Sequence, residues 1–364
     1  MIPIPNPKRL QTSNKLLFLI SGPIKVLLQI IYLWQTLGYQ TKASKWMLVQ
    51  NPPSIPTLLV SGVICWLRGT RLIIDWHNFG YSILALKLGE KHPLVRISHA
   101  YEVVCARFAS AHLAVTNAMV KALQSKLGSS APILALHDRP AELFQPLSQH
   151  DRLGFLQRYS VLSEHFTALC EGKAKLLVSS TSWTPDEDFS IFLDALCRYA
   201  KRTREHPRWP ELIVVITGKG PQKEYYLSRI QELRRQDALE QVTIYTDWLS
   251  FEDYALLLGA ADLGVSLHTS SSGVDLPMKV VDMFGAGLPV IGWSKYAAWP
   301  ELVKESVNGK GFGSSTEMAE ILWELFEPRS TWLPKLRAGA MQESKRRWNH
   351  EWDSVGKKLF DSEG

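Results

Sequence analysis

The fold is decided by residues 263–284, which read LGVSLHTSSSGVDLPMKVVDMF. A short β-branched run ends at Leu267, a loop of small hydroxyl residues follows, and Pro277 opens a helical pattern. The order of strand, polar loop and helix is the repeating unit of a parallel α/β sheet. Ligands of such sheets bind beyond the carboxyl ends of the strands, so we expect this loop to lie at a binding site.

The same unit recurs along the chain. The other apolar runs followed by a polar or glycine loop cover residues 72–74, 112–115, 175–178, 212–216, 242–245 and 288–291. Prolines and a polar run interrupt the pattern between residues 138 and 173. We therefore predict an α/β fold with two domains, each built on a parallel sheet. The predicted segments are an N-terminal domain 1–150, a linker 151–172, a second domain 173–335 and a C-terminal helix 336–364.

Composition argues against several classes of protein. The chain has 364 residues, 46% hydrophobic and 21% charged, which is too apolar for a disordered chain. Its 41 Lys and Arg exceed its 35 Asp and Glu, and we interpret this excess as spread along the chain, which favours anionic partners. Four distant cysteines without a CxxC pair argue against a disulfide scaffold or a structural zinc site. No segment reaches the ~18–20 apolar residues of a membrane-spanning helix.

A glycine loop, GKGP at residues 218–221, follows one of the strand patterns and opens a helix. Glycines allow a close approach of the backbone to a ligand, and a helix N-terminus favours an anion. The run is too short for a Walker A loop and lacks the third glycine of the dinucleotide fingerprint. An anion-binding loop and an ordinary tight turn therefore both remain open.

Lys279 and Asp282 lie three residues apart in the helical pattern after Pro277 and share one face of it. A lysine can bind phosphate, and a carboxylate can accept hydrogen bonds from two ribose hydroxyls. This pair suits a sugar nucleotide. The alternative is a solvated ion pair worth about 0.3–0.5 kcal/mol.

Two further polar clusters follow strand patterns. The acidic run 186–188 invites a metal site, but a capping box that starts at Thr184, with proline at the first helical position, explains it better. The run 75–78, DWHN, places His77 where catalytic groups of α/β proteins often lie. A structural histidine is the alternative.

Six strings of the chain resemble the chitobiosyldiphosphodolichol beta-mannosyltransferase family, and the similarity runs from about residue 45 to the C-terminus. They are VQNPP at 49–53, IDWHN at 74–78, VTNAM at 115–119, STSWT at 180–184, ITGKGP at 216–221, and residues 268–285. The resemblance implies a GT-B fold, in which two Rossmann-like domains with parallel sheets face a cleft and a final helix returns to the N-terminal domain. It also implies inverting transfer of mannose from GDP-mannose to GlcNAc2-diphosphate-dolichol, forming the first β1,4-mannosyl link of the lipid-linked N-glycan precursor.

The resemblance also implies roles for single residues. The donor side would comprise Gly218, Lys219, Gly220, Ser271, Ser272, Gly273, Lys279 and Asp282. Lys279 would offset phosphate charge, and Asp282 would hold the ribose hydroxyls. The acceptor side would comprise Asn78 and Asn117, with His77 as the catalytic base and Asp75 as the second candidate. No metal or bound cofactor is expected, because lysine and a helix N-terminus would stabilise the leaving diphosphate.

One departure from the family opens an alternative. Family members begin with a membrane-spanning helix and a first strand–loop unit that we do not find in this chain, so we expect an incomplete N-terminal domain. The alternative function is that of a catalytically impaired, truncated paralogue that acts as a binding or assembly partner at the membrane. A GT-B transferase that uses another nucleotide sugar is a further alternative.

The resemblance places the chain on the cytosolic face of the endoplasmic reticulum membrane, and we expect a peripheral protein because we find no membrane-spanning segment in the sequence. Residues 16–39, with flanking lysines and Trp34, could lie on an anionic membrane surface. An ordinary core helix is the alternative. Other mannosyltransferases of the pathway are possible partners, and nucleic acid is not expected.

Overall fold

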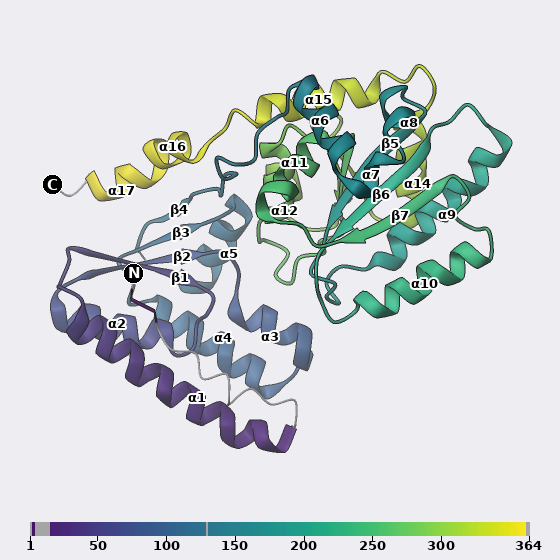
Figure 1. The fold of residues 1–364 in the computed structure, drawn as a ribbon. Helices are drawn as coiled ribbons and strands as arrows, with labels where there is room; N and C mark the ends of the chain where they lie inside the picture. The colour runs from purple at the N-terminus through teal and green to yellow at the C-terminus, as the bar shows by residue number, and fades with distance from the viewer. Residues whose placement is uncertain (1, 4–14, 129, 362–364) are drawn as a thin grey trace. The chain divides into compact units, whose positions relative to one another are not determined.

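The computed structural model describes residues 2–3, 15–128 and 130–361. The chain divides into two compact units, Met1–Leu136 and His137–Gly364. Each unit carries its own parallel sheet (Figure 1). The predicted α/β class is therefore confirmed, and the two units are described separately.

The first unit contains a four-stranded sheet with the order β1-β2-β3-β4, and all its pairs are parallel. Its strands are β1 (Trp46–Asn51), β2 (Arg71–Trp76), β3 (Ala111–Ala114) and β4 (Ile133–Ala135). Its helices are α1 (Lys15–Gln35), the π-helical η2 (Thr36–Gln40), α2 (Thr57–Arg68), α3 (Gly80–Leu88), α4 (Pro93–Ala106) and α5 (Asn117–Leu127). The hydrophobic run of β2 is fully buried, as is typical of a strand covered on both faces.

Helix α1 packs on α2. Leu33 of α1 forms a small buried cluster with Val60 and Ile64 of α2, and Trp34 packs against that cluster. In the described part of the chain, no helix combines the length and the hydropathy needed to cross a bilayer.

The second unit contains a six-stranded parallel sheet with the order β10-β9-β8-β5-β6-β7. Its strands are β5 (Ala174–Ser180), β6 (Glu211–Thr217), β7 (Val242–Asp247), β8 (Leu263–Ser266), β9 (Val290–Trp293) and β10 (Gly309–Phe312). The chain leaves β5 for β6 on one side and later returns to β8 on its other side. Strand β5 is therefore the topological switch point, where ligands of open α/β sheets bind.

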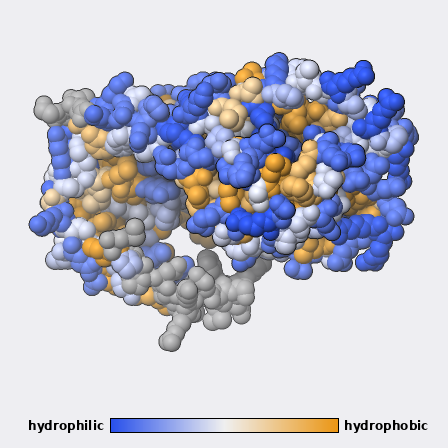
Figure 2. Space-filling model, turned by 45° about the horizontal axis from the view of Figure 1, so that its top comes forward, coloured by the Kyte–Doolittle hydropathy of each residue, from blue (hydrophilic) through white to orange (hydrophobic). Residues whose placement is uncertain are grey.

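Most helices of the second unit lie around this sheet, whereas the C-terminal ones lie apart from it (Figure 1). The helices of this unit are α6 (Gln149–Arg158), α7 (Ser160–Ser163), α8 (Phe166–Cys170), α9 (Phe189–Glu205), α10 (Lys223–Arg235), α11 (Phe251–Ala260), α12 (Met278–Gly285), α13 (Trp299–Leu302), α14 (Ser315–Phe326), α15 (Trp332–Glu343), α16 (Trp348–Glu351), the π-helical η3 (Trp352–Gly356) and α17 (Lys357–Asp361). A large buried cluster of aliphatic and aromatic side chains joins α9 and α14 to the sheet. The view in Figure 2 shows a largely hydrophilic surface with apolar residues between.

The boundary between the units falls at residues 136 and 137, earlier than residue 150. The stretch expected to be a linker, 151–172, is largely helical, because Phe155, Leu156 and Leu162 are buried in the second unit. The C-terminal residues form three short α-helices and a π-helical turn instead of one helix. The expectation that they return to the first unit stays a prediction.

Candidate functional site

A cavity of about 340 Å³ lies at the carboxyl ends of β5, β6 and β7. Such a volume falls in the usual range for small-molecule sites. Its walls come from three strand ends and from the first turns of α11 and α12; the lining residues are Ser180, Thr181, Thr217, Gly218, Trp248, Leu249, Ser250, Phe251, Tyr254, Lys279 and Asp282. Three of the residues predicted from the sequence, Gly218, Lys279 and Asp282, thus meet in one cavity beside the switch point.

The glycine loop after β6 packs against the loop after β5. A Cβ atom on Gly218, where φ is +144°, would lie 1.8 Å from the carbonyl oxygen of Thr181. A Cβ atom on Gly220 would lie 1.7 Å from the carbonyl oxygen of Ser182. Both distances are impossible for real atoms, so these glycines are required by loop-on-loop packing, whatever ligand the cavity takes.

Trp248, which lines the cavity, forms a cation–π pair with Lys219, which lies outside the lining. The Lys219 ammonium lies 4.3 Å from the centre of the Trp248 ring, and 59% of Trp248 is exposed. An exposed indole at the mouth of a cavity offers a flat apolar surface on which a planar ring can stack. Sequence reasoning missed Trp248, because a single tryptophan after a strand has no distinguishing pattern.

The side chain of Lys279 is only partly exposed to solvent. Its ammonium forms an ion pair with Glu187 and lies 3.5 Å from the hydroxyl of Ser182. The capping box predicted from Thr184 is wrong: α9 begins at Phe189, and its N-cap is Asp188, whose carboxylate accepts from the Ser190 amide at 2.9 Å. Because Glu187 does not cap this helix, its carboxylate can pair with Lys279.

Asp282 is half-buried in the cavity wall near Tyr254. Burial raises the pKa of Asp282 to about 7, and the nearby carboxyl also contributes to the raised pKa of Tyr254, whose main cause is burial. A carboxyl with such a pKa changes protonation near neutral pH. Strongly perturbed acids in cavities are frequent at functional sites.

The hydroxyl-rich loop after β8 is organised by Asp275, which the sequence did not single out. This buried carboxylate accepts from His268 Nε2 at 2.9 Å and from the hydroxyls of Ser270 and Ser272. Burial alone would raise the pKa of Asp275, but these hydrogen bonds outweigh it and hold the pKa below its usual value. The loop residues Ser271, Ser272 and Gly273 are half-buried and lie outside the lining of the cavity.

The first unit gathers the other candidates at the carboxyl edge of its sheet. His77 Nε2 lies 3.1 Å from Asp75 Oδ2, and both side chains are partly exposed. Asn78 Oδ1 accepts from the amide of Phe79 at 2.8 Å and so holds the turn before α3. Asn117 is exposed at the first position of α5. In the described residues, no group of three or more His, Cys, Asp or Glu is placed to hold a metal ion.

These features define a glycosyltransferase of the GT-B class. The family model "Glycosyl transferases group 1" matches residues 173–327. The crystal structure of Anabaena Alr3699/HepE in complex with UDP superposes with a TM-score of 0.67 at 19% identity, covering 93% of this chain and 83% of that one. This likeness confirms the predicted fold of two Rossmann-like domains.

Sequence comparison identifies the family to which this chain belongs. The chain is 51% identical over 359 residues to the chitobiosyldiphosphodolichol beta-mannosyltransferase of Arthroderma benhamiae, covering 98% of this chain and 80% of that protein. It is 44% identical to the protein of the same name from Yarrowia lipolytica, covering 96% of this chain and 73% of that protein. The chain belongs to this family of mannosyltransferases, and the interpretation as a non-catalytic paralogue is not favoured.

Replacement of Asp282 by Asn should change how stability depends on pH. Because burial raises the folded-state pKa of Asp282 to about 7, well above that of an ordinary aspartate, the wild-type chain loses stability as the pH rises from the usual aspartate range up to about 7, and the loss is complete above that pH. Asp282→Asn has no carboxyl to ionise, so its Tm should exceed that of the wild type by more at pH 8 than at pH 5. Thermal unfolding across this pH range measures the difference. The exposed Asp353→Asn is the control, and a pH-independent gap for Asp282→Asn would contradict the burial argument.

Proposed function

We propose that the chain transfers mannose from GDP-mannose to GlcNAc2-diphosphate-dolichol and so forms a β1,4-mannosyl link. Family membership supports the reaction. The observation that carries the donor assignment is the meeting of Lys279 and Asp282 in one cavity at the switch point of the second sheet. This cavity would take the nucleotide half of the donor.

Each part of a nucleoside diphosphate has a counterpart in this cavity. Asp282 would accept hydrogen bonds from the ribose hydroxyls. Lys279, in the first turn of α12, would meet the diphosphate together with the partial positive charge of the helix N-terminus. The exposed face of Trp248 would stack on the base.

The first unit would supply the base for the reaction. The acceptor hydroxyl attacks C1 of mannose, the bond from C1 to the diphosphate oxygen breaks, and the configuration inverts. His77 would take the hydroxyl proton, and Asp75, 3.1 Å away, would stabilise the imidazolium that forms. We propose that Lys279 and the α12 N-terminus stabilise the negative charge of the leaving diphosphate without a metal.

Donor binding is tested by thermal shift. GDP and GDP-mannose should raise the Tm of the wild-type chain, and Lys279→Ala should remove most of that rise because the phosphate loses its cation. Lys201→Ala, on the exposed side of α9, is the matched control. A larger rise in Tm with UDP- or ADP-sugars than with GDP-mannose would contradict the donor assignment.

The role of His77 is tested in a transfer assay with a phytanyl-diphosphate chitobiose acceptor and EDTA present. His77→Ala should lower kcat by roughly 10²–10⁴-fold, the usual contribution of a general base, and leave the GDP-induced Tm rise unchanged. Near-normal kcat in His77→Ala would show that another group takes the proton. Loss of wild-type activity in EDTA, restored by a divalent cation, would refute the metal-free mechanism.

The charge of the first unit supports a proposal of membrane association. Residues 1–136 contain 14 Lys and Arg but only 3 Asp and Glu, whereas residues 137–364 contain 27 and 32. The positive excess is thus concentrated in one unit, and our interpretation of an even spread was wrong. Of the three acids, Glu102 is buried and Asp75 contacts His77. Such a surface favours an anionic partner.

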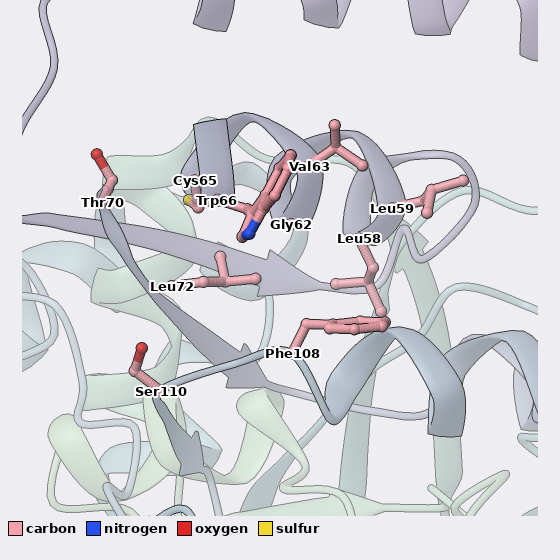
Figure 3. Close-up of a pocket in the computed structure, with 10 residues that line it drawn as sticks. All are labelled: Leu58, Leu59, Gly62, Val63, Cys65, Trp66, Thr70, Leu72, Phe108 and Ser110. Carbon is pink, nitrogen blue, oxygen red and sulfur yellow. The ribbon is translucent and has the colours of Figure 1, made fainter. Parts of the chain in front are cut away.

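An apolar face lies on the same unit. A groove of about 450 Å³ is lined mostly by side chains of α2, and Figure 3 shows Trp66, Leu58 and Phe108 around it. Trp66 is 80% and Phe108 70% exposed. Exposed apolar residues continue along α2 and α4; they are Leu59, Val63, Leu67, Leu94, Ile97 and Val104. Aromatic and aliphatic side chains on a basic unit are typical of a surface that docks on anionic lipid.

We therefore propose that α2 and α4 face the membrane. Trp34, expected from the sequence to contact lipid, instead packs against the cluster between α1 and α2. The side chains of residues 16–20, also part of that expectation, lie outside the described residues.

Vesicle co-sedimentation tests this face. The wild-type chain should sediment with phosphatidylcholine vesicles that contain phosphatidylserine and less with phosphatidylcholine alone, because basic residues attract anionic headgroups. Trp66→Ser with Phe108→Ser should lose most of this binding, since two interfacial rings are removed. Tyr225→Ser, an exposed ring of the second unit, is the matched control. Unchanged sedimentation of the double variant would eliminate this docking face.

A further inference from the structure

The carboxylate of Glu187 lies behind Lys279 and is almost completely removed from solvent. Glu187 is 3% exposed. Its Oε2 accepts from the hydroxyl of Thr181 at 2.6 Å and from the amide of Ser182 at 2.7 Å. Its Oε1 pairs with the Lys279 ammonium. One buried carboxylate thus connects the loop after β5 to the first turn of α12.

The neighbouring backbone fixes this carboxylate in place. Glu187 forms an isolated antiparallel bridge with His268. The amide and hydroxyl of Thr269 donate to the carbonyl of Asp186 at 3.1 and 2.8 Å. Residues 186–187 are therefore held by the loop after β8 as well, and the carboxylate has little freedom to move.

A lysine needs such a partner to act as a fixed cation. Its four-carbon stem is flexible, and its ammonium is a point charge without the rigid geometry of arginine. The ammonium of Lys279 has three donors. Contacts with Glu187 and Ser182 engage two of them and leave one for a ligand in the cavity that Lys279 lines.

We propose that Glu187 is a positioning residue for donor binding: it holds the Lys279 ammonium where the diphosphate of a nucleotide sugar would bind. The proposal rests on the proposed function of the cavity. Glu187 is too buried to touch the diphosphate itself, so its effect passes through Lys279.

The experiment compares GDP with guanosine, because only GDP carries phosphate. Glu187→Gln should weaken GDP binding by roughly tenfold or more, the equivalent of a lost charge-assisted hydrogen bond, and should leave guanosine binding within about twofold. Glu187→Asp should restore part of the GDP affinity. Isothermal titration of folded protein, checked by circular dichroism, gives both dissociation constants.

A variant pair separates positioning from simple support of the fold. In a Lys279→Ala background, Glu187→Gln should cause no further loss of GDP affinity, because the residue through which it acts is gone. This double variant also avoids a buried unpaired carboxylate, so it should fold even if a single variant does not. Equal losses of GDP and guanosine binding, or additive losses in the double variant, would overturn the inference.

Failure of the proposed function has a different signature. A wild-type chain that binds neither GDP nor GDP-mannose would refute the donor site and this inference with it. A wild-type chain that binds GDP normally, with Glu187→Gln equal to it, would refute only the role of Glu187.

Discussion

The position of β5 between β6 and β8 is the constraint on which the site depends. Parallel strands end at one edge of a sheet, and the chain must leave β5 in one direction and come back on the other side. The loops after β5, β6 and β8 therefore diverge above a single strand. Gly218 and Gly220 then allow two of these loops to pack directly together, and the third is joined to them through Thr269 and Asp186. The cavity lies beside β5, lined by the ends of β5 and β6, the loop after β7 and the N-terminal parts of α11 and α12.

Local patterns were sufficient to predict seven of the ten strands of the described residues, the presence of two domains and the placement of Lys279 and Asp282 on one helix face, but they missed β1, β4 and β10. Each of the predicted features depends on residues close together in the sequence, whose spacing determines which way their side chains point. Family resemblance added the reaction and the candidate roles, but no geometry.

Contacts between residues far apart in the sequence could not be predicted from local patterns. Glu187 and Lys279 are 92 positions apart, and only the folded sheet brings them together. The same acid was assigned to a capping box because the local pattern at 184–187 fits one; tertiary structure instead moves the helix start to Phe189. Counting charge over the whole chain misled in a similar way, because the negative charge of the second unit offsets part of the positive charge of the first.

Lys279 of the proposed donor cavity is paired with Glu187, and this pairing has a consequence for the selectivity that we propose. Glu187 neutralises Lys279, and Asp282, with a pKa of about 7, is only partly ionised at neutral pH. The cavity therefore does not present a strong bare positive charge that would attract any anion. A ligand gains affinity only if it offers phosphate to the remaining donor of Lys279 and, at the same time, hydroxyls that favour the ionised form of Asp282. Inorganic phosphate meets the first condition alone, and a nucleoside diphosphate meets both.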